Sequence, residues 1–255
     1  MSALAGLGVL VTRPHAQAAS LGARLEAVGA RAYRLPALTI GAVAYDRSLL
    51  GPIDRYDFVV FVSANAVRFG AALLEDAGDR RLFAVGPATG AALEALGRTV
   101  ARVPADGYDS EHLLAMAEFR QPSGRRILIV RGGEGRTLLG DTLRARGAEV
   151  THVDVYERRC ATPDPLELEA IEAAWAQGHI HVVTATSGDI LRCLTTLLTP
   201  RGRALLARTP LVVAGSRIAT IARELGLHGA LLVAPSAEDA QLVATIVAAA
   251  EHVRQ

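Results

Sequence analysis

Short apolar runs alternate along this chain with longer segments in which apolar residues recur at helical spacing. The runs are rich in valine, isoleucine and leucine, as expected for strands that are buried on both faces of a sheet. Turn residues separate these runs from the helical segments. The pattern predicts strands at 8–11, 33–40, 58–62, 82–86, 98–103, 126–130, 149–156, 181–184, 211–214 and 229–234.

Two of these strands run into similar turns. The run 58–62 is followed by Ser63-Ala64-Asn65 and a helical pattern, and the run 181–184 is followed by Thr186-Ser187-Gly188-Asp189 and another helix. Backbone N–H groups at such a helix start point outward, and the polar side chains can cap the helix or touch a ligand. Two such turns in similar surroundings predict a duplicated domain.

Glycine and proline mark the ends of the predicted elements. Gly29 follows a helical pattern that starts near Gln17, and Pro87 stands at the start of a helix, where its missing N–H costs little. A further helix is expected from His112. Pro36 cannot donate to a sheet, so 33–40 is predicted to be an edge or crossing strand. The alternation of strand and helix predicts the α/β class with parallel sheets.

A set of turn residues recurs in the same order in the two halves of the chain. The matched pairs are Arg13 and Arg131 (offset 118), Gly29 and Gly147 (118), Ser63 and Ser187 (124), Gly86 and Gly215 (129), and Pro104 and Pro235 (131). Small insertions in loops explain the drift of the offset. The repeat predicts two similar α/β lobes.

Composition narrows the class of protein. The 255 residues are 51% hydrophobic and 21% charged, which suits a globular protein with a substantial core. There is no apolar run of about 18 residues or more, so we expect no membrane span. The N-terminal residues lack the basic segment of a signal peptide, and a cytoplasmic protein is therefore predicted.

The charged and sulfur-containing residues exclude several chemistries. The net charge of +1 disfavours a general nucleic-acid binder. All 27 basic residues are arginine, which excludes a lysine Schiff base and a Walker-type phosphate lysine, although coding bias is the simpler explanation of this composition. Cys160 and Cys193 have no metal-binding spacing, so we expect reduced thiols and no metal site.

In open parallel sheets, ligands bind beyond the carboxyl ends of the strands, at the turns into the helices. This rule selects Thr12, Arg13, Ser63, Asn65, Gly86, Thr89, Arg131, Ser187, Asp189, Ser216 and Arg217. Helix N-termini and guanidinium groups together suit an anionic ligand that is rich in carboxylates. Each serine or threonine taken alone can equally be a helix cap, and that alternative stays open.

Other candidate motifs lack the required context. The run Gly132-Gly133-Glu134-Gly135 does not have the spacing of a dinucleotide fingerprint, and neither Ser63 nor Ser187 lies in a G-x-S-x-G turn. His179 and His181 would share one face of a strand, but no further metal ligand is near in sequence, so we interpret them as strand-edge residues. For Tyr156, at the end of an extended run, a core role and a functional role both fit.

A further set of short motifs occurs in a fixed order. They are Val11-Thr12-Arg13-Pro14, Leu35-Pro36, Phe61–Val67, Ala84–Thr89, Asp109-Ser110-Glu111, Ile129–Gly132, Val155–Arg158 and Gly215–Ala219. Each is weak alone, but their joint order resembles the uroporphyrinogen-III synthase family over nearly the whole chain.

The resemblance implies a particular threading of the two lobes. The first strand and helix would belong with the C-terminal third, so that lobe one is 1–36 with 161–255 and lobe two is 40–155. The chain would cross between the lobes at 36–40 and 156–160, and the two crossings would form a two-stranded ladder. This threading would account for Pro36.

The resemblance also implies an activity. Members of the family cyclise the linear tetrapyrrole hydroxymethylbilane, with inversion of ring D and loss of water through a spiro intermediate, and without a cofactor. Correct folding of the substrate would be the main catalytic effect, because unassisted closure gives the symmetric isomer. Hydroxymethylbilane synthase, which supplies the substrate, is an implied candidate partner, and a monomer is expected.

Site residues follow from the same resemblance. Tyr156 matches the family tyrosine implicated in water loss, and Thr89 matches a family threonine in the cleft. The implied substrate-binding residues are Thr12, Arg13, Ser63, Ala64, Asn65, Gly86, Arg131, Gly132, Ser187, Gly188, Ser216 and Arg217. Some family members carry a threonine pair in the loop 215–219, where this chain has Arg217 and Ile218, so hydroxyl contacts from that loop cannot be carried over.

Two other classes of function stay open at this point. One is a two-lobed protein that binds a small anion without chemistry. The other is a regulatory relative that has kept the fold and lost the activity. Incubation with hydroxymethylbilane and separation of the type I and type III products would distinguish all three.

Overall fold

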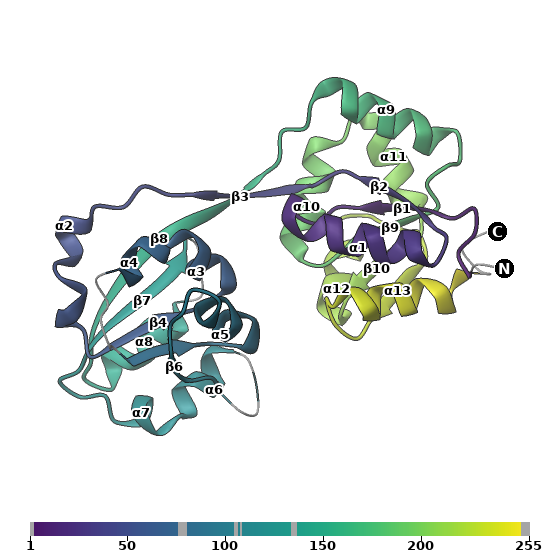
Figure 1. The fold of residues 1–255 in the computed structure, drawn as a ribbon. Coiled ribbons are helices and arrows are strands. Elements are labelled where there is room, and N and C mark those ends of the chain that lie inside the picture. Colours follow the sequence, from purple (N-terminus) through teal and green to yellow (C-terminus); the bar gives the residue numbers. More distant parts are fainter. Residues whose placement is uncertain (1–2, 76–80, 105–106, 108, 134–136, 251–255) are drawn as a thin grey trace. The chain divides into compact units, whose positions relative to one another are not determined.

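The computed structural model describes residues 3–75, 81–104, 107, 109–133 and 137–250, and these divide into two compact units. Unit 1 contains residues 1–39 and 159–255, and unit 2 contains residues 40–158. Each unit has its own sheet with helices on both faces (Figure 1). The α/β class with two similar, mostly parallel sheets is therefore confirmed.

The sheet of unit 1 has five parallel strands in the order β11-β10-β9-β1-β2. Their bounds are β1 Gly8–Val11, β2 Arg31–Arg34, β9 Val182–Ala185, β10 Leu211–Ala214 and β11 Leu231–Ala234. The helices are α1 His15–Ala27, α9 Pro165–Ala176, α10 Gly188–Leu197, α11 Pro200–Arg208, α12 Ser216–Glu224 and α13 Asp239–Ala248. Apolar residues of α1 and α13 share one core with Val9, Val11, Val182 and Val212 of the strands.

The sheet of unit 2 has six strands in the order β3-β8-β7-β4-β5-β6. Their bounds are β3 Leu38–Ala42, β4 Phe58–Phe61, β5 Arg81–Ala84, β6 Val100–Arg102, β7 Arg126–Gly132 and β8 Glu149–Cys160. The helices are α2 Arg47–Leu50, the 3₁₀ turn η1 Ile53–Arg55, α3 Ala64–Phe69, α4 Ala71–Leu74, α5 Pro87–Glu94, α6 Ser110–Ala115, α7 Ala117–Arg120 and α8 Leu138–Ala145.

Alternate residues of the central strands of unit 2 point to opposite faces, as the two-residue period of a strand requires. Val59 and Phe61 of β4 pack with α3, α4 and α5, whereas Phe58 and Val60 pack with α6, α7 and α8. On the second face, Phe58, Phe83 and Phe119 form an edge-to-face cluster with ring centroids 4.8–5.6 Å apart. The strand β4 is buried on both faces, as its continuous apolar run predicts.

The two sheets share one strand order, because β2-β1-β9-β10-β11 of unit 1 corresponds to β8-β7-β4-β5-β6 of unit 2. The helices that follow β1 and β7 also end alike. Gly29 and Gly147 both have positive φ, and the next residue in each case donates its N–H to a carbonyl five residues earlier. These are two Schellman motifs at the predicted offset of 118 residues.

Several predicted bounds differ from those in the structure, and two of the differences have a clear local cause. The single extended segment expected at 33–40 is two strands in different sheets, because Leu35-Pro36-Ala37 interrupts it and the chain leaves unit 1 there. The helix expected from His112 begins at Ser110, because the Asp109 carboxylate accepts the N–H of His112 and so caps an earlier start.

The chain passes between the units twice, between residues 39 and 40 and between residues 158 and 159. The segments around these points pair as β3 and β8. Val43 donates its N–H to the Val155 carbonyl, and Ala161 donates to the Ala37 carbonyl. Partner numbers fall on one segment as they rise on the other, so the two crossings run antiparallel. None of the described helices is long and apolar enough to cross a membrane.

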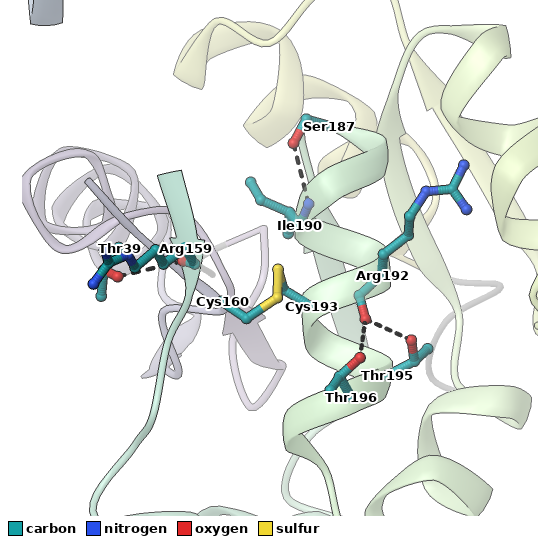
Figure 2. Close-up of a disulfide and its surroundings, with 9 residues drawn as sticks. All are labelled: Thr39, Arg159, Cys160, Ser187, Ile190, Arg192, Cys193, Thr195 and Thr196. Carbon is teal, nitrogen blue, oxygen red and sulfur yellow. Dashed lines mark hydrogen bonds between the residues drawn. A yellow bond between two sulfur atoms is a disulfide. The ribbon is translucent and has the colours of Figure 1, made fainter. Parts of the chain in front are cut away.

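The expectation of two reduced thiols is wrong for this structure. Cys160, the last residue of β8, forms a disulfide with Cys193 of α10, and their Cα atoms lie 5.0 Å apart (Figure 2). The sequence spacing excluded a metal motif but said nothing about this pair, because the two cysteines are brought together only by tertiary packing. The disulfide attaches the strand to unit 1 directly after the second crossing.

We predict that loss of this disulfide destabilises unit 1. The bond closes a loop over a sequence separation of 33 residues, so the variant Cys160→Ser should lower the free energy of unfolding by about 2–4 kcal/mol. Urea denaturation with and without reductant measures this, and thiol titration of the denatured, unreduced protein should find no free thiol. Two titratable thiols in that sample would contradict the pairing.

Candidate active site

Unit 2 contains a cavity of about 280 Å³ at the carboxyl ends of β4 and β7. From β4 the chain continues to β5 and β6 on one side, and it later returns to place β7 and β8 on the other side. This reversal of strand order is where open α/β sheets bind ligands, because the flanking helices leave the sheet on opposite faces. The cavity is lined by Val62, Ser63, Ser110, Ile129, Arg131, Gly132, Gly133, Leu139, Gly140, His152, Tyr156 and Arg158.

Tyr156 is buried, with 3% of its surface exposed, and its hydroxyl lies 3.0 Å from the Ser63 hydroxyl. A register shift between β7 and β8 places Tyr156 opposite Gly132. A Cβ atom on Gly132 would lie 2.6 Å from the tyrosine ring, so glycine is needed there for the ring to fit. Phe69 stacks on the Tyr156 ring, with ring centroids 5.9 Å apart. The sequence placed Tyr156 at the end of an extended run, and the structure makes it a wall of the cavity.

Ser63 caps a helix and also contacts a second hydroxyl in the cavity. Its hydroxyl oxygen accepts the N–H of Ala66 at 3.1 Å and so caps α3, and the same hydroxyl contacts Tyr156. Because a serine hydroxyl has one proton and two lone pairs, Ser63 can accept from Ala66 and donate to the Tyr156 oxygen. The phenolic proton of Tyr156 is then left to donate to a third group.

Two arginines give the cavity a positive charge. Arg131 Nε donates to the Asp154 carboxylate at 2.9 Å, and the Arg131 side chain is 19% exposed. The Arg158 guanidinium carbon lies 5.9 Å from the centre of the Tyr156 ring, within reach of a cation–π contact. Charged guanidinium groups beside a buried hydroxyl pair suit a ligand with carboxylates.

His152 lines the same cavity on β8, and it was not among the predicted site residues. Both of its ring nitrogens are buried without a hydrogen-bond partner in the described part of the chain. A Cβ on Gly140 of α8 would lie 2.3 Å from His152 Nε2, so that glycine makes room for the imidazole. Burial lowers the pKa of His152 below the usual 6.5, and the charges of Arg131 and Arg144 lower the pKa further. Asp154 and Asp141 act in the opposite direction but do not reverse the shift.

The other predicted residues of unit 2 lie around the cavity or away from it. Ala64 is exposed and Asn65 half-buried in the first turn of α3, and Gly86 is the N-cap of α5. Thr89 is 4% exposed in the first turn of α5, and it does not line the cavity. The structure therefore brings together Ser63, Arg131, Gly132 and Tyr156 from the predicted set.

The predicted residues of unit 1 are placed as follows. The Thr12 hydroxyl is fully buried and donates to the Thr184 carbonyl, and Arg13 forms an ion pair with Asp239. Ser187 caps α10 by accepting the N–H of Ile190 at 3.2 Å (Figure 2). The remaining predicted residues lie in the first turns of helices, Gly188 half-buried in α10 and Ser216 and Arg217 exposed in α12.

Some cavity residues were missed by the sequence analysis. His152 lies at two-residue spacing from Asp154 and Tyr156 on one predicted strand, and this period was the signal that could have identified it. Ser110, Leu139 and Gly140 come from helices that only tertiary packing brings to β7. His181, which the sequence left as a strand-edge residue, accepts the N–H of Gly8 at Nδ1. The described residues contain no group of three or more histidine, cysteine and acidic side chains able to hold a metal. Residues 134–136 of the glycine-rich run lie outside the described residues.

The fold and the cavity define a protein of two α/β units, each built on a mostly parallel sheet. Unit 2 has a cationic pocket where its strand order reverses. The family model for uroporphyrinogen-III synthase HemD matches residues 19–244. The uroporphyrinogen-III synthase of Salmonella typhimurium is 36% identical over 232 residues, which cover 86% of this chain and 92% of the relative. The Escherichia coli enzyme of the same name is 34% identical over 230 residues, with the same coverage. The chain belongs to the uroporphyrinogen-III synthase family.

Two solved structures show the same fold. A mutant uroporphyrinogen III synthase from the extremely thermophilic bacterium Thermus thermophilus matches with a TM-score of 0.60 and 18% identity, and the match covers 96% of this chain and 99% of that one. The synthetase from Helicobacter pylori matches with a TM-score of 0.61 and 14% identity, over 95% and 99% of the two chains. At these identities the likeness concerns the fold alone.

We expect His152 to stay neutral at pH values where an ordinary histidine is protonated. Its pKa is lowered in the folded state, so the unfolded state binds more protons below about pH 6.5, and stability is lost as the pH falls through that window. The imidazole can be titrated by NMR. His152→Gln should flatten the dependence of unfolding free energy on pH below 6.5, and an unchanged slope would contradict the shift.

We also expect Gly132→Ala to disturb the Tyr156 ring. The added methyl group overlaps a buried ring, so the variant should lose about 1–3 kcal/mol of unfolding free energy together with the Ser63–Tyr156 contact. Gly133→Ala is the matched control, because a Cβ there meets no atom within 4 Å. Urea denaturation of both variants measures the difference, and equal stabilities would show that the close fit is absent.

Proposed function

We propose that this chain is a uroporphyrinogen-III synthase that converts hydroxymethylbilane to uroporphyrinogen III with inversion of ring D and loss of water. Membership of the family supports the reaction. The observation that carries the site assignment is the partly buried Tyr156–Ser63 hydroxyl pair in a cationic cavity. The relatives are named as enzymes, so the alternatives of an inactive binding or regulatory protein are not favoured.

The cavity suits one part of the substrate rather than the whole. Its volume of about 280 Å³ is at or below the lower end of ligand pockets, which is about 300 Å³. A linear tetrapyrrole with eight carboxylate chains is much larger than such a pocket. We therefore assign the cavity to a single pyrrole ring, the one that bears the hydroxymethyl group.

The chemistry needs a departing hydroxyl and a ring held in a defined pose. The electron-rich pyrrole expels the hydroxyl of its hydroxymethyl group, which leaves an azafulvene-like cation. Attack by ring D forms the spiro intermediate, and rearrangement with closure gives the inverted isomer. The oxygen leaves as water once it has gained a proton, so a positioned hydrogen-bond donor assists the step. No electron is gained or lost overall, and the residues of the cavity are sufficient for these roles.

Tyr156 is the donor that we assign to this step. Ser63 accepts from Ala66 and can donate to the phenolic oxygen, which directs the phenolic proton to the cavity. Phe69 stacks on the ring, and the backbone at Gly132 lies close against it. The donor is thus fixed before the substrate arrives, and less of the binding free energy is lost in ordering it. Thr89, which the resemblance implied as catalytic, is buried outside the cavity, and we assign it no contact with the reacting atoms.

We also propose a partner, an oligomeric state and a compartment for the enzyme. Hydroxymethylbilane is unstable toward closure to the symmetric isomer, so direct supply from hydroxymethylbilane synthase is a reasonable arrangement. A monomer in the cytoplasm would satisfy the reaction. The cavity requires no metal or cofactor for the steps described above.

The expected result for Tyr156→Phe is a loss of type III product from a protein that stays folded. Removal of a positioned donor should lower the rate of type III formation by roughly 100-fold or more, while unassisted closure to type I continues. Freshly made hydroxymethylbilane is supplied, and the products are oxidised to porphyrins and resolved by chromatography. Normal type III turnover by this variant would remove Tyr156 from the mechanism.

Tyr56→Phe is the control for this experiment. It deletes the same hydroxyl from a tyrosine that is 1% exposed in the same unit, where the hydroxyl donates to the Leu50 carbonyl. That tyrosine does not line the cavity. The control should keep the ratio of type III to type I product, whatever small loss of stability it causes.

A further inference from the structure

The repeat places one arginine after or near the end of the first strand of each half. The two arginines use different nitrogens for their hydrogen bonds within the protein. Arg13 follows β1 in unit 1, and Arg131 lies 118 residues later at the end of β7 in unit 2. The family resemblance implies the same role for both, namely binding of substrate carboxylates. Their hydrogen bonds show that only one of the two arginines can bind a substrate carboxylate in this structure.

Arg13 uses its terminal nitrogens within the protein. Nη1 donates to the Asp239 carboxylate and Nη2 donates to the Ala237 carbonyl at 2.6 Å. The residue is 9% exposed, and its third nitrogen, Nε, is buried without a partner among the described residues. The two terminal nitrogens that would bind a substrate carboxylate are thus already bonded to Asp239 and Ala237. Arg13 therefore links β1 to the start of α13 within unit 1.

Arg131 has the reverse arrangement. Only Nε is bonded, to Asp154 on the neighbouring strand, and neither terminal nitrogen has a hydrogen bond within the described residues. Arg131 and Asp154 are register partners in the β7–β8 ladder, so the backbone itself sets the carboxylate beside Nε. A guanidinium fixed at Nε keeps four N–H donors on its two terminal nitrogens, which is the group that binds a carboxylate through two parallel hydrogen bonds.

We propose that Arg131 is the carboxylate-binding residue of the cavity and that Asp154 is the positioning residue that holds it there. This inference deepens the proposed function, on which it rests. The next residue pair along the same ladder is Gly132 and Tyr156, and Arg131 and Tyr156 both line the cavity. The ligand is an acetate or propionate chain of the pyrrole ring that enters the cavity.

The geometry also explains why Asp154 aids binding rather than competing for the arginine. It occupies one of the five guanidinium donors and fixes the plane of the group, so that less rotamer freedom is lost when a ligand binds. The neighbouring imidazole of His152 adds no second cation, because burial and the arginines lower its pKa. Of the two arginines that line the cavity, Arg131 is thus oriented by a carboxylate, and its planar fork suits an anion of matching planar shape.

Kinetics separate positioning from chemistry. We expect Asp154→Asn to raise KM about 10-fold and Arg131→Gln to raise KM about 10–100-fold, with kcat in both within about twofold of wild type. Arg131→Lys keeps the charge without the fork, so its KM should lie between those of wild type and Arg131→Gln. A fall in kcat at constant KM for Asp154→Asn would overturn its positioning role.

Asp57→Asn is the matched control. Asp57 also accepts from an arginine at 2.9 Å in unit 2, from Arg125 Nη1, and neither residue lines the cavity. The control removes an Arg–Asp pair of the same length and charge without touching the subsite. Its KM should stay at the wild-type value, and a rise equal to that of Asp154→Asn would show a general effect of losing an ion pair.

A binding experiment tests the carboxylate without relying on turnover. The probe is a monopyrrole with one acetate and one propionate chain, compared with its dimethyl ester by calorimetry or NMR titration. Wild type should prefer the acid, and Arg131→Gln should abolish the preference while leaving ester binding unchanged. Arg13→Gln should lower the melting temperature and keep the ratio of acid to ester affinity.

The outcomes distinguish this inference from the proposed function. Acid preference that depends on Arg131, in a protein that makes no type III product, would support the subsite and contradict the synthase assignment. Type III synthesis with an acid preference unchanged by Arg131→Gln would keep the synthase and overturn the subsite. A ratio that depends on Arg13 instead would overturn the division of roles between the two arginines.

Discussion

The site depends on a constraint of parallel sheets. Neighbouring strands whose crossover helices leave on opposite faces cannot close over their common end, so a gap opens there. In unit 2 the strands are β4 and β7, and their helices α3 and α8 belong to the cores on the two faces. The gap is polar because β4 ends in the capping residue Ser63 and β7 ends in Arg131. Tyr156 of β8 reaches the gap because Gly132 leaves space for its ring.

Duplication produced the same reversal in unit 1, but the two copies have diverged in how they use it. The strand orders agree, and the Schellman motifs at Gly29 and Gly147 are equivalent. The two units differ at the ends of these strands. A terminal nitrogen of Arg13 donates to Asp239, whereas the terminal nitrogens of Arg131 have no hydrogen-bond partner among the described residues. A duplicated fold can thus keep one copy of a site open and turn the other into an internal ion pair, with few changes outside the turns.

Much of the fold follows from local pattern. Continuous apolar runs identified the central strands, and glycine and proline located most helix ends, because these signals arise within a few residues of chain. The segment 33–40 failed as one strand because an extended pattern does not say in which sheet its two parts pair. Ser63 could be singled out from its place at the end of a predicted strand, whereas Tyr156 was assigned through the family motif, because its pattern equally suited a core residue. The disulfide, the Gly140–His152 fit and the burial of Arg13 could not, because each joins segments that only the folded chain brings together.

The order of the strands sets a condition on how the chain folds during synthesis. Unit 2 is one continuous stretch, 40–158, whereas unit 1 needs both ends of the chain. Thr12 at the end of β1 bonds to Thr184, which is 172 residues later. At roughly 5–20 residues per second, β1 emerges roughly 10–35 s before its central neighbour β9 exists. All four residues of β1 are buried in the finished sheet. Until β9 arrives, this apolar strand has at most β2 beside it, so the growing chain carries an open strand edge while the unit that contains the cavity is already complete.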